Sequence, residues 1–439
     1  MIDFHLGEVL NGVILIPDDS ESNAGIVLVH GAGAHDQNAY RKEAEAFAQN
    51  GITTLIYDKR TIGYRADGVG ENSRSYSLLA EDALAAVKLL QSHPNVNSER
   101  VGLWGESEGG SVTTLAASRS GDVSFVITVG ANGVPPIQQT SWHLENTLRH
   151  QGVTAHSFLN AVTRKSLRFA LSAEMFAEAT YQIIPVLERV NQPILAIWGR
   201  NDQNSPPAES AQIFQQALKD GGNEHYTIRF ISNADHTLRP SKDGFTQQSD
   251  ELTPEAMEIM TRWINALADG ETFEPTMTKP IPEQARFSDE RVARPETADS
   301  VWLHLAFIIV SAALFGSYII FSLIDRLRQS SLPMVKGSIR WAMAVLSVLG
   351  LATTIGLFVY IFSIIMTYQV SFVIFGRPLF WILLQLSAWL IVFLTILLAF
   401  FWWKNHSILP KQVRIRLILL LLGGSLFIPW AFHWQLLIN

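Results

Sequence analysis

A serine flanked by glycines is the first residue in this chain whose setting could support chemistry. Residues 105–109 read Gly-Glu-Ser-Glu-Gly, after an apolar run at residues 101–104 and before a helix-compatible segment. This order predicts a strand, a sharp turn that holds Ser107 in a strained conformation, and a helix. Glycine is required two residues to either side, because side chains there would collide with the neighbouring strand and helix. The five residues alone fit an ordinary glycine-rich turn equally well, so the context decides between the two interpretations.

A nucleophilic serine needs a base to take its proton and an acid to orient that base. Asp202 follows the apolar stretch 193–198, and His236 follows the apolar stretch 226–231. Both stretches predict buried strands, so both side chains are expected at the carboxyl ends of strands. The chain order Ser107, Asp202, His236 is the order that this topology requires. The sequence therefore predicts one catalytic group assembled from three separate loops.

The elements that must position these residues alternate along the first 270 residues. Apolar runs predict strands, and segments with helical spacing or a glycine stop predict helices between them. This alternation predicts an α/β fold with a mostly parallel sheet and helices on both faces, in which ligands bind beyond the carboxyl ends of the strands. The predicted strands are residues 9–16, 25–29, 52–57, 101–104, 124–129, 193–198 and 226–231, and the predicted helices are 38–49, 78–90 and 254–267.

The 439 residues divide into two parts that differ in net charge. Residues 1–300 carry a net charge of -15, whereas residues 301–439 carry nine basic residues and one acidic residue, Asp325. The acidic part lacks any basic stripe, which argues against nucleic acid as a partner. Cysteine is absent, which excludes disulfides, thiolate metal sites and a cysteine nucleophile. No residue spacing indicates a metal site or a bound cofactor.

The first 270 residues are expected to form one domain with an insertion. Residues 137–189 are polar and helical, and they predict a helical cap over the sheet. Aromatic residues are candidates for the inner face of this cap, and the alternative is that they only pack the cap onto the core. They are Trp142, Phe158, Phe169, Phe176 and Tyr181. Residues 271–300 contain four prolines among mixed charges and predict a linker.

The last 139 residues predict an all-α transmembrane bundle with the lipid bilayer as partner. The segment 301–324 has no charged residue and is long enough to cross ~30 Å of hydrocarbon. Further spans are predicted at residues 341–367, 378–402 and 417–437, which gives about four in total.

Basic residues on the loops predict the orientation of these spans. Lys and Arg concentrate between spans one and two and between spans three and four, which places those loops in the cytoplasm and both chain ends outside. The first residues, Met-Ile-Asp-Phe-His, show no signal peptide that would export the acidic part. The two signals conflict, and the loop charges are the basis for expecting an extracytoplasmic location.

Residues 1 to about 268 resemble an α/β-hydrolase, and in particular bacterial hydrolases related to serine aminopeptidases and dienelactone-hydrolase-like esterases. Five segments carry the resemblance: His-Gly-Ala-Gly at 30–33, Tyr-Asp-Lys-Arg at 57–60, Gly-Glu-Ser-Glu-Gly-Gly at 105–110, Trp-Gly-Arg-Asn-Asp at 198–202 and Ala-Asp-His at 234–236. The sequence departs from this pattern after Arg60, where Thr-Ile-Gly replaces the usual glycine.

The resemblance and the chemistry together imply a role for each residue. Ser107 would attack an acyl carbonyl, His236 would move the proton, and Asp202 would hold the imidazole. The backbone N–H groups of Ala32 and Glu108, with Gly33 as a neighbouring candidate, would form the oxyanion hole. The expected substrate is a small-molecule or peptide ester, thioester or amide. An aminopeptidase remains an alternative, and so does a membrane sensor or transporter accessory that uses the domain only to bind.

Charged residues near the predicted site have more than one interpretation. Glu106 and Glu108 could select a cationic substrate, or they could be solvated or paired with Arg60. We expect Asp58 and Arg60 to form a structural pair and Asp82 to be a satisfied polar group on its helix.

Overall fold

The computed structural model describes residues 10–18, 23–60, 75–328 and 337–438. It divides into two compact units. The sheet unit comprises Met1–His143 and Phe176–Asp289, and the helical unit comprises Leu144–Met175 and Glu290–Asn439. The Thr-Ile-Gly departure at residues 61–63 and the loop residue Lys336 lie outside the described residues.

One mostly parallel sheet forms the core of the sheet unit. Its strand order is β1-β3-β2-β4-β5-β6-β7-β8, and of these eight described strands only β1 runs antiparallel to its neighbour. The central strands are rich in Val, Ile and Leu and are buried on both faces, as expected for parallel strands covered by helices. The strands are β1 Gly12–Leu15, β2 Gly25–Val29, β3 Thr53–Tyr57, β4 Val101–Glu106, β5 Val126–Val129, β6 Ile194–Gly199, β7 Tyr226–Ile231 and β8 Thr276–Met277.

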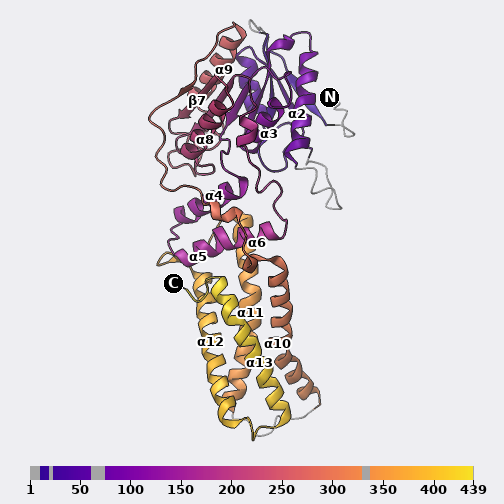
Figure 1. The fold of residues 1–439 in the computed structure, drawn as a ribbon, viewed down its shortest axis with the longest axis vertical. Coiled ribbons are helices and arrows are strands. Elements are labelled where there is room, and N and C mark those ends of the chain that lie inside the picture. The colour runs from indigo at the N-terminus through magenta and orange to yellow at the C-terminus, as the bar shows by residue number, and fades with distance from the viewer. Residues whose placement is uncertain (1–9, 19–22, 61–74, 329–336, 439) are drawn as a thin grey trace. The chain divides into compact units, whose positions relative to one another are not determined.

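Helices pack on both faces of this sheet (Figure 1). Apolar residues of α2 (Tyr76–Gln91), α3 (Glu108–Ala117) and α8 (Pro207–Asp220) form one buried cluster with the strands. Those of α1 (Arg41–Gln49) and α9 (Pro254–Ala268) form a second cluster with the opposite face. The predicted α/β fold class is therefore confirmed, with β2 and β7 at their predicted bounds.

Two features of the sheet unit differ from the sequence prediction. Helix α8 lies between β6 and β7, where the sequence analysis assigned no helix. Strand β8 pairs with β7 and lies inside residues 271–300, which were predicted to be a linker. A strand of two residues has too few side chains to produce a periodic signal, and it is defined by the backbone of its neighbour.

Among the described residues, four long apolar helices dominate the helical unit (Figure 1). They are α10 (Val301–Leu327), α11 (Gly337–Thr367), α12 (Leu379–Asn405) and α13 (Lys411–His433), and each is long and apolar enough to cross a membrane. The number agrees with the predicted four spans. The fourth helix begins earlier than predicted, because it starts directly after Pro410, and it ends at His433 rather than at residue 437.

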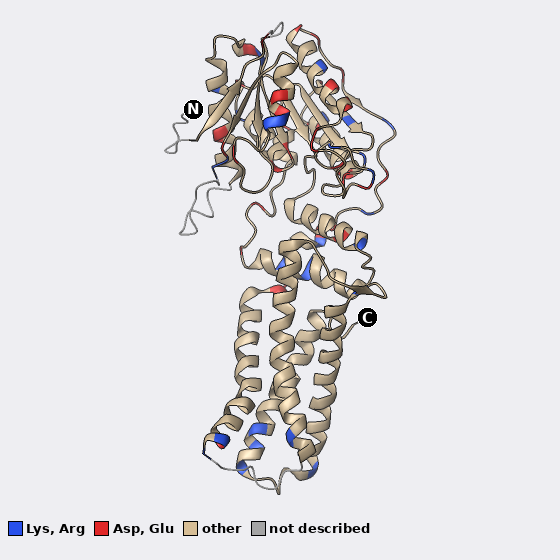
Figure 2. Ribbon diagram, turned by 180° about the vertical axis from the view of Figure 1, so that it is seen from behind, with Lys and Arg blue, Asp and Glu red and all other residues tan. Residues whose placement is uncertain are grey.

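The Lys and Arg residues of the four long helices lie at the end where α10 ends and α11 begins (Figure 2). Among the residues there, Arg416 of α13 pairs with Asp325 of α10 at 2.7 Å. The ends of the helices therefore differ in charge, as the loop residues predicted.

The middle of the predicted cap packs within the helical unit. It forms α5 (His156–Asn160), the π-helix η2 (Ala161–Lys165) and α6 (Ser166–Ser172). Phe158 is fully buried and its ring lies 5.2 Å from that of Trp381, while Phe169 stacks edge-on against His304 at 5.5 Å. These aromatic side chains cover apolar helices. Their apolar character alone does not predict which apolar surface they cover.

An ionic cluster holds α6 to the start of α10. Asp299, which is fully buried, lies 3.3 Å from Arg168 and 3.6 Å from Lys165. Arg168 also pairs with Glu296 at 2.8 Å, and the hydroxyl of Ser172 donates to the carbonyl of Asp299 at 2.9 Å. Buried charges are stable only when paired in this way.

Candidate active site

Ser107 occupies a strained turn between β4 and α3. Its backbone has φ 55° and ψ -115°, outside the regions that residues with side chains normally adopt. A Cβ at Gly105 would lie 2.2 Å from the carbonyl oxygen of Gly109, and one at Gly109 would lie 2.4 Å from that of Val29. Both glycines are therefore required for α3 to approach the sheet this closely. The predicted strand, turn and helix are present.

Asp202 and His236 contact one another beyond the ends of β6 and β7. Nδ1 of His236 lies 2.9 Å from Oδ2 of Asp202. The other carboxylate oxygen, Oδ1, accepts the backbone N–H groups of Asn204 and Ser205, each at 2.8 Å. The carboxylate is thus fixed by three hydrogen bonds and can fix the imidazole in turn.

The electrostatics of His236 suit a base. Burial acts to lower its pKa, but the charge and hydrogen bond of Asp202, together with the charges of Glu106 and Asp235, more than offset burial and raise the pKa above its usual value. Its Nε2 is buried and has no hydrogen-bond partner among the described residues. This nitrogen is therefore available to accept a proton.

The serine and the histidine both lie at the end of β5. The N–H of Ser107 donates to the carbonyl of Val129 at 2.7 Å. At the next residue, Gly130, an added Cβ would lie 2.8 Å from Nδ1 of His236. Ser107 thus contacts the last residue of β5, and His236 contacts the residue that follows it. Both groups therefore lie at the same edge of the sheet.

The loop that follows β2 carries the predicted oxyanion donor Ala32. The N–H of Gly31 donates to the hydroxyl of Tyr40 at 3.0 Å, and the carbonyl of Gly31 accepts Nζ of Lys59 at 2.6 Å. Gly33 has φ +103°, a conformation that favours glycine. Both polar groups of Gly31 are therefore fixed by side chains from other elements.

The two glutamates beside Ser107 connect to this loop. Oε1 of Glu106 accepts the hydroxyl of Tyr40 at 3.1 Å, and Oε1 of Glu108 accepts Nζ of Lys59 at 2.6 Å. Oε2 of Glu106 is buried and has no hydrogen-bond partner within the described part of the chain, and burial raises the pKa of this carboxyl to about 7. Tyr40 was not among the predicted site residues, and Lys59 was named only within the segment 57–60, with no role. The position of Lys59 two residues after the end of β3, at the carboxyl edge of the sheet, was the available signal.

The predicted partners of Arg60 are wrong. Arg60 pairs with Asp82 of α2 through two hydrogen bonds, at 2.6 and 2.5 Å, rather than with Asp58 or a glutamate beside Ser107. Asp58 instead accepts the N–H of Gln37 at 2.9 Å. Asp82 is a satisfied polar group, as predicted.

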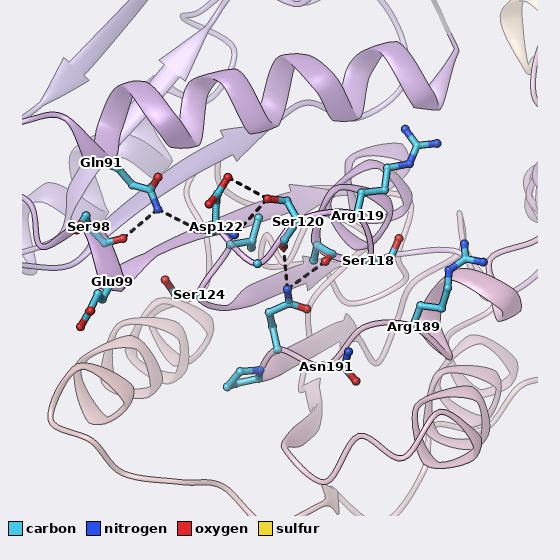
Figure 3. A pocket seen from close by; sticks show the side chains of 15 residues that line it. Gln91, Ser98, Glu99, Ser118, Arg119, Ser120, Asp122, Ser124, Arg189 and Asn191 are labelled. Atoms are coloured by element: carbon cyan, nitrogen blue, oxygen red, sulfur yellow. Dashed lines mark hydrogen bonds between the residues drawn. The ribbon is translucent and has the colours of Figure 1, made fainter.

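The hollow in Figure 3 lies at the opposite edge of the sheet. Its lining includes Ser124, which precedes β5, and Pro193, which precedes β6. Nε2 of Gln91 donates to the carbonyls of Ser98 and Asp122, both at 2.9 Å, so these loops are tied to each other. This edge carries the amino ends of the strands, where ligands of such sheets do not bind. Among the described residues no group of three His, Asp or Glu side chains could hold a metal ion.

Comparisons with known proteins give similar sequences over part of the chain. Residues 84–242 match the family described as BAAT / Acyl-CoA thioester hydrolase C terminal, a stretch that contains Ser107, Asp202 and His236. The chain is 32% identical over 104 residues to a protein named Thiohydrolase aneE from Aspergillus aculeatus, which covers 24% of this chain and 32% of that protein. It is 38% identical over 86 residues to Polyketide transferase grgF from a Penicillium species, and this match covers 20% of this chain and 29% of that protein. The chain thus spans about a third of the length of the curated relatives it matches.

Solved structures with similar folds include two hydrolases. The 2,6-dihydroxy-pseudo-oxynicotine hydrolase is 15% identical with a TM-score of 0.43, covering 62% of this chain and 68% of that one. Dienelactone hydrolase from Anabaena variabilis is 18% identical with a TM-score of 0.37, covering 62% and 97%.

Proposed function

We propose that this chain, an α/β-hydrolase joined to four apolar helices, is a membrane-tethered serine hydrolase that cleaves an acyl thioester or ester. The pair formed by His236 and Asp202 carries the proposal, because it leaves Nε2 of His236 with no partner among the residues that the structure describes, at the edge of the sheet that presents Ser107. The strained backbone of Ser107 adds support, since such strain persists where function requires it.

The proposed reaction has two halves. Nε2 of His236 accepts the hydroxyl proton as Oγ of Ser107 attacks the carbonyl carbon, and the resulting imidazolium is stabilised by Asp202. The protonated imidazole then gives its proton to the leaving thiolate or alkoxide, and an acyl-serine remains. Water attacks this ester, His236 accepts the proton of the water, and its return to Oγ of Ser107 releases the free acid. The N–H groups of Ala32 and Glu108 would stabilise each tetrahedral oxyanion.

The similar sequences favour a thioester among the possible substrates. The matched family is described by acyl-CoA thioester hydrolysis, and one relative is named a thiohydrolase. An amide substrate, as in an aminopeptidase, is the second candidate. Glu106 favours it, because its unpartnered carboxylate oxygen beside Ser107 could accept a substrate ammonium group.

Serine-directed labelling tests the proposal. We expect a fluorophosphonate to label the full-length protein in detergent, and Ser107→Ala to abolish labelling while leaving the melting temperature unchanged. On a panel of acyl-CoA thioesters, N-acetylcysteamine thioesters, nitrophenyl esters and aminoacyl anilides, Ser107→Ala should lower kcat by roughly 10⁵- to 10⁶-fold on the best substrate. A folded wild-type protein that is not labelled would support the binding-module alternative. Preference for aminoacyl anilides would support the peptidase.

A further inference from the structure

Lys59 is a buried lysine that links the oxyanion loop to the residue after Ser107. Its side chain is 4% exposed, and its Nζ lies 2.6 Å from both the carbonyl oxygen of Gly31 and Oε1 of Glu108. Its backbone N–H donates to the carbonyl of His35 at 3.0 Å, so the backbone that carries it is tied to the same loop. A buried ammonium group with two such short bonds is held in one place.

The carbonyl that Lys59 binds belongs to the peptide that carries the proposed oxyanion donor. The C=O of Gly31 and the N–H of Ala32 are parts of one planar trans peptide and point in opposite directions. Fixing the carbonyl toward Nζ therefore fixes the direction of the N–H on the other side. The loop contains Gly31 and Gly33 and would otherwise allow this peptide to rotate at little steric cost.

The peptide before Gly31 is held through Glu106, the residue that precedes Ser107. The N–H of Gly31 donates to Tyr40, and Tyr40 donates to Glu106. The two residues that flank the nucleophile thus reach the two polar groups of Gly31 through different side chains. The orientation of the Gly31–Ala32 peptide therefore depends on the turn that carries Ser107.

We infer that Lys59 is a positioning residue that holds the Gly31–Ala32 peptide with its N–H directed at the oxyanion, and that Glu108 is the counter-ion that holds Lys59. Glu108 then contributes twice: its backbone N–H is one donor, and its side chain orients the other donor through Lys59. The inference rests on the proposed serine hydrolase function and specifies which side chains complete its oxyanion hole.

The test compares rates of fluorophosphonate labelling, because the phosphoryl oxygen of this probe occupies the oxyanion hole. Lys59→Met removes both hydrogen bonds and retains the length of the side chain. We expect its labelling rate and its kcat to fall by about 10²-fold, within the range for loss of one oxyanion donor, with KM changed less than about threefold. Arg60→Met is the matched control: it breaks the neighbouring buried pair with Asp82 and should keep its labelling rate within about threefold even if its melting temperature falls.

Glu108→Gln gives a second readout that retains the backbone N–H. We expect a drop of roughly 3- to 10-fold in labelling, and the double variant Lys59→Met/Glu108→Gln should equal Lys59→Met within about twofold, because the glutamate side chain acts through the lysine. If Lys59→Met does not fold, Glu108→Gln decides. Slower labelling at an unchanged melting temperature supports the inference, and an unchanged labelling rate overturns it.

Other outcomes separate the inference from the function on which it rests. A labelled wild type with Lys59→Met labelled at the same rate overturns the inference alone. Equal losses in Lys59→Met and Arg60→Met indicate a structural effect and also overturn it. A folded wild type that is not labelled overturns the proposed function, and the inference with it.

Discussion

Carboxylates surround the nucleophile and differ in what they contact. Asp202 contacts the imidazole of His236, Glu108 contacts Lys59, and Glu106 contacts Tyr40. Glu106 also lies close enough to His236 for its charge to raise the pKa of the imidazole, while burial raises its own pKa to about 7. Two groups that interact in this way titrate as a pair, so the pH dependence of the site belongs to both.

The variant Glu106→Gln tests this electrostatic link. The proposed reaction needs a neutral imidazole, so the rate falls as the pH decreases through the pKa of His236. Removing the negative charge of Glu106 lowers that pKa, and we expect the acidic limb of the kcat/KM profile to move to lower pH by roughly 0.5 to 1 unit. The introduced glutamine keeps an oxygen that can accept the Tyr40 hydroxyl. The exposed Glu99→Gln serves as control, and a limb that stays in place or moves to higher pH would refute the link.

At the scale of elements, the close approach of β4, α3 and β2 decides where Ser107 lies. Ser107 is the single residue between the end of the strand at Glu106 and the start of the helix at Glu108, and the contacts at Gly105 and Gly109 leave no room for a methyl group. Because Ser107 N–H also bonds to β5, the turn is held by three strands and one helix. The close packing that Gly105 and Gly109 permit thus maintains the strained backbone of Ser107.

Gly105→Ala should separate α3 from the sheet. The added Cβ would lie 2.2 Å from a backbone oxygen, which cannot rotate away as a side chain would. We expect a loss of roughly 2 to 3 kcal/mol in unfolding free energy and loss of fluorophosphonate labelling, measured by denaturation in detergent and by gel fluorescence. Gly121→Ala, where nothing lies within 4 Å of the new Cβ, should stay within about 0.5 kcal/mol of wild type. Equal stability of the two variants would contradict this account.

At the scale of the whole molecule, charge separates the sheet unit from the helical unit. The first 300 residues are strongly acidic, whereas the basic residues of the four long helices lie at the end where α10 ends and α11 begins (Figure 2). The positive-inside rule assigns that end to the cytoplasm. We therefore propose that the start of α10 and the sheet unit face the outside.

The absence of cysteine makes this orientation directly testable. Ser98→Cys places a single thiol at an exposed position of the sheet unit, and Ser407→Cys places one in the exposed loop before α13. In intact cells we expect a membrane-impermeant maleimide to label Ser98→Cys at least tenfold more than Ser407→Cys, and permeabilisation to remove the difference. Labelling of Ser407→Cys alone in intact cells would reverse the proposed orientation.

The sequence by itself determined the features that depend on neighbours along the chain. Apolar runs marked the strands, glycine spacing marked the turn at Ser107, and long uncharged segments marked four helices, because each depends on local periodicity or length. The rule that ligands bind at the carboxyl ends of parallel strands then related Asp202 and His236 to Ser107. Their catalytic roles remain a proposal.

Only the tertiary structure decided which charged and aromatic groups meet. Lys59 and Glu108 are 49 positions apart, and Arg60 pairs with Asp82 rather than with a carboxylate nearer in sequence. Any of several carboxylates satisfies a lysine or arginine equally well, so packing of the elements selects the partner. Phe158 likewise covers apolar helices, since an aromatic side chain is buried by any apolar surface that the fold brings to it.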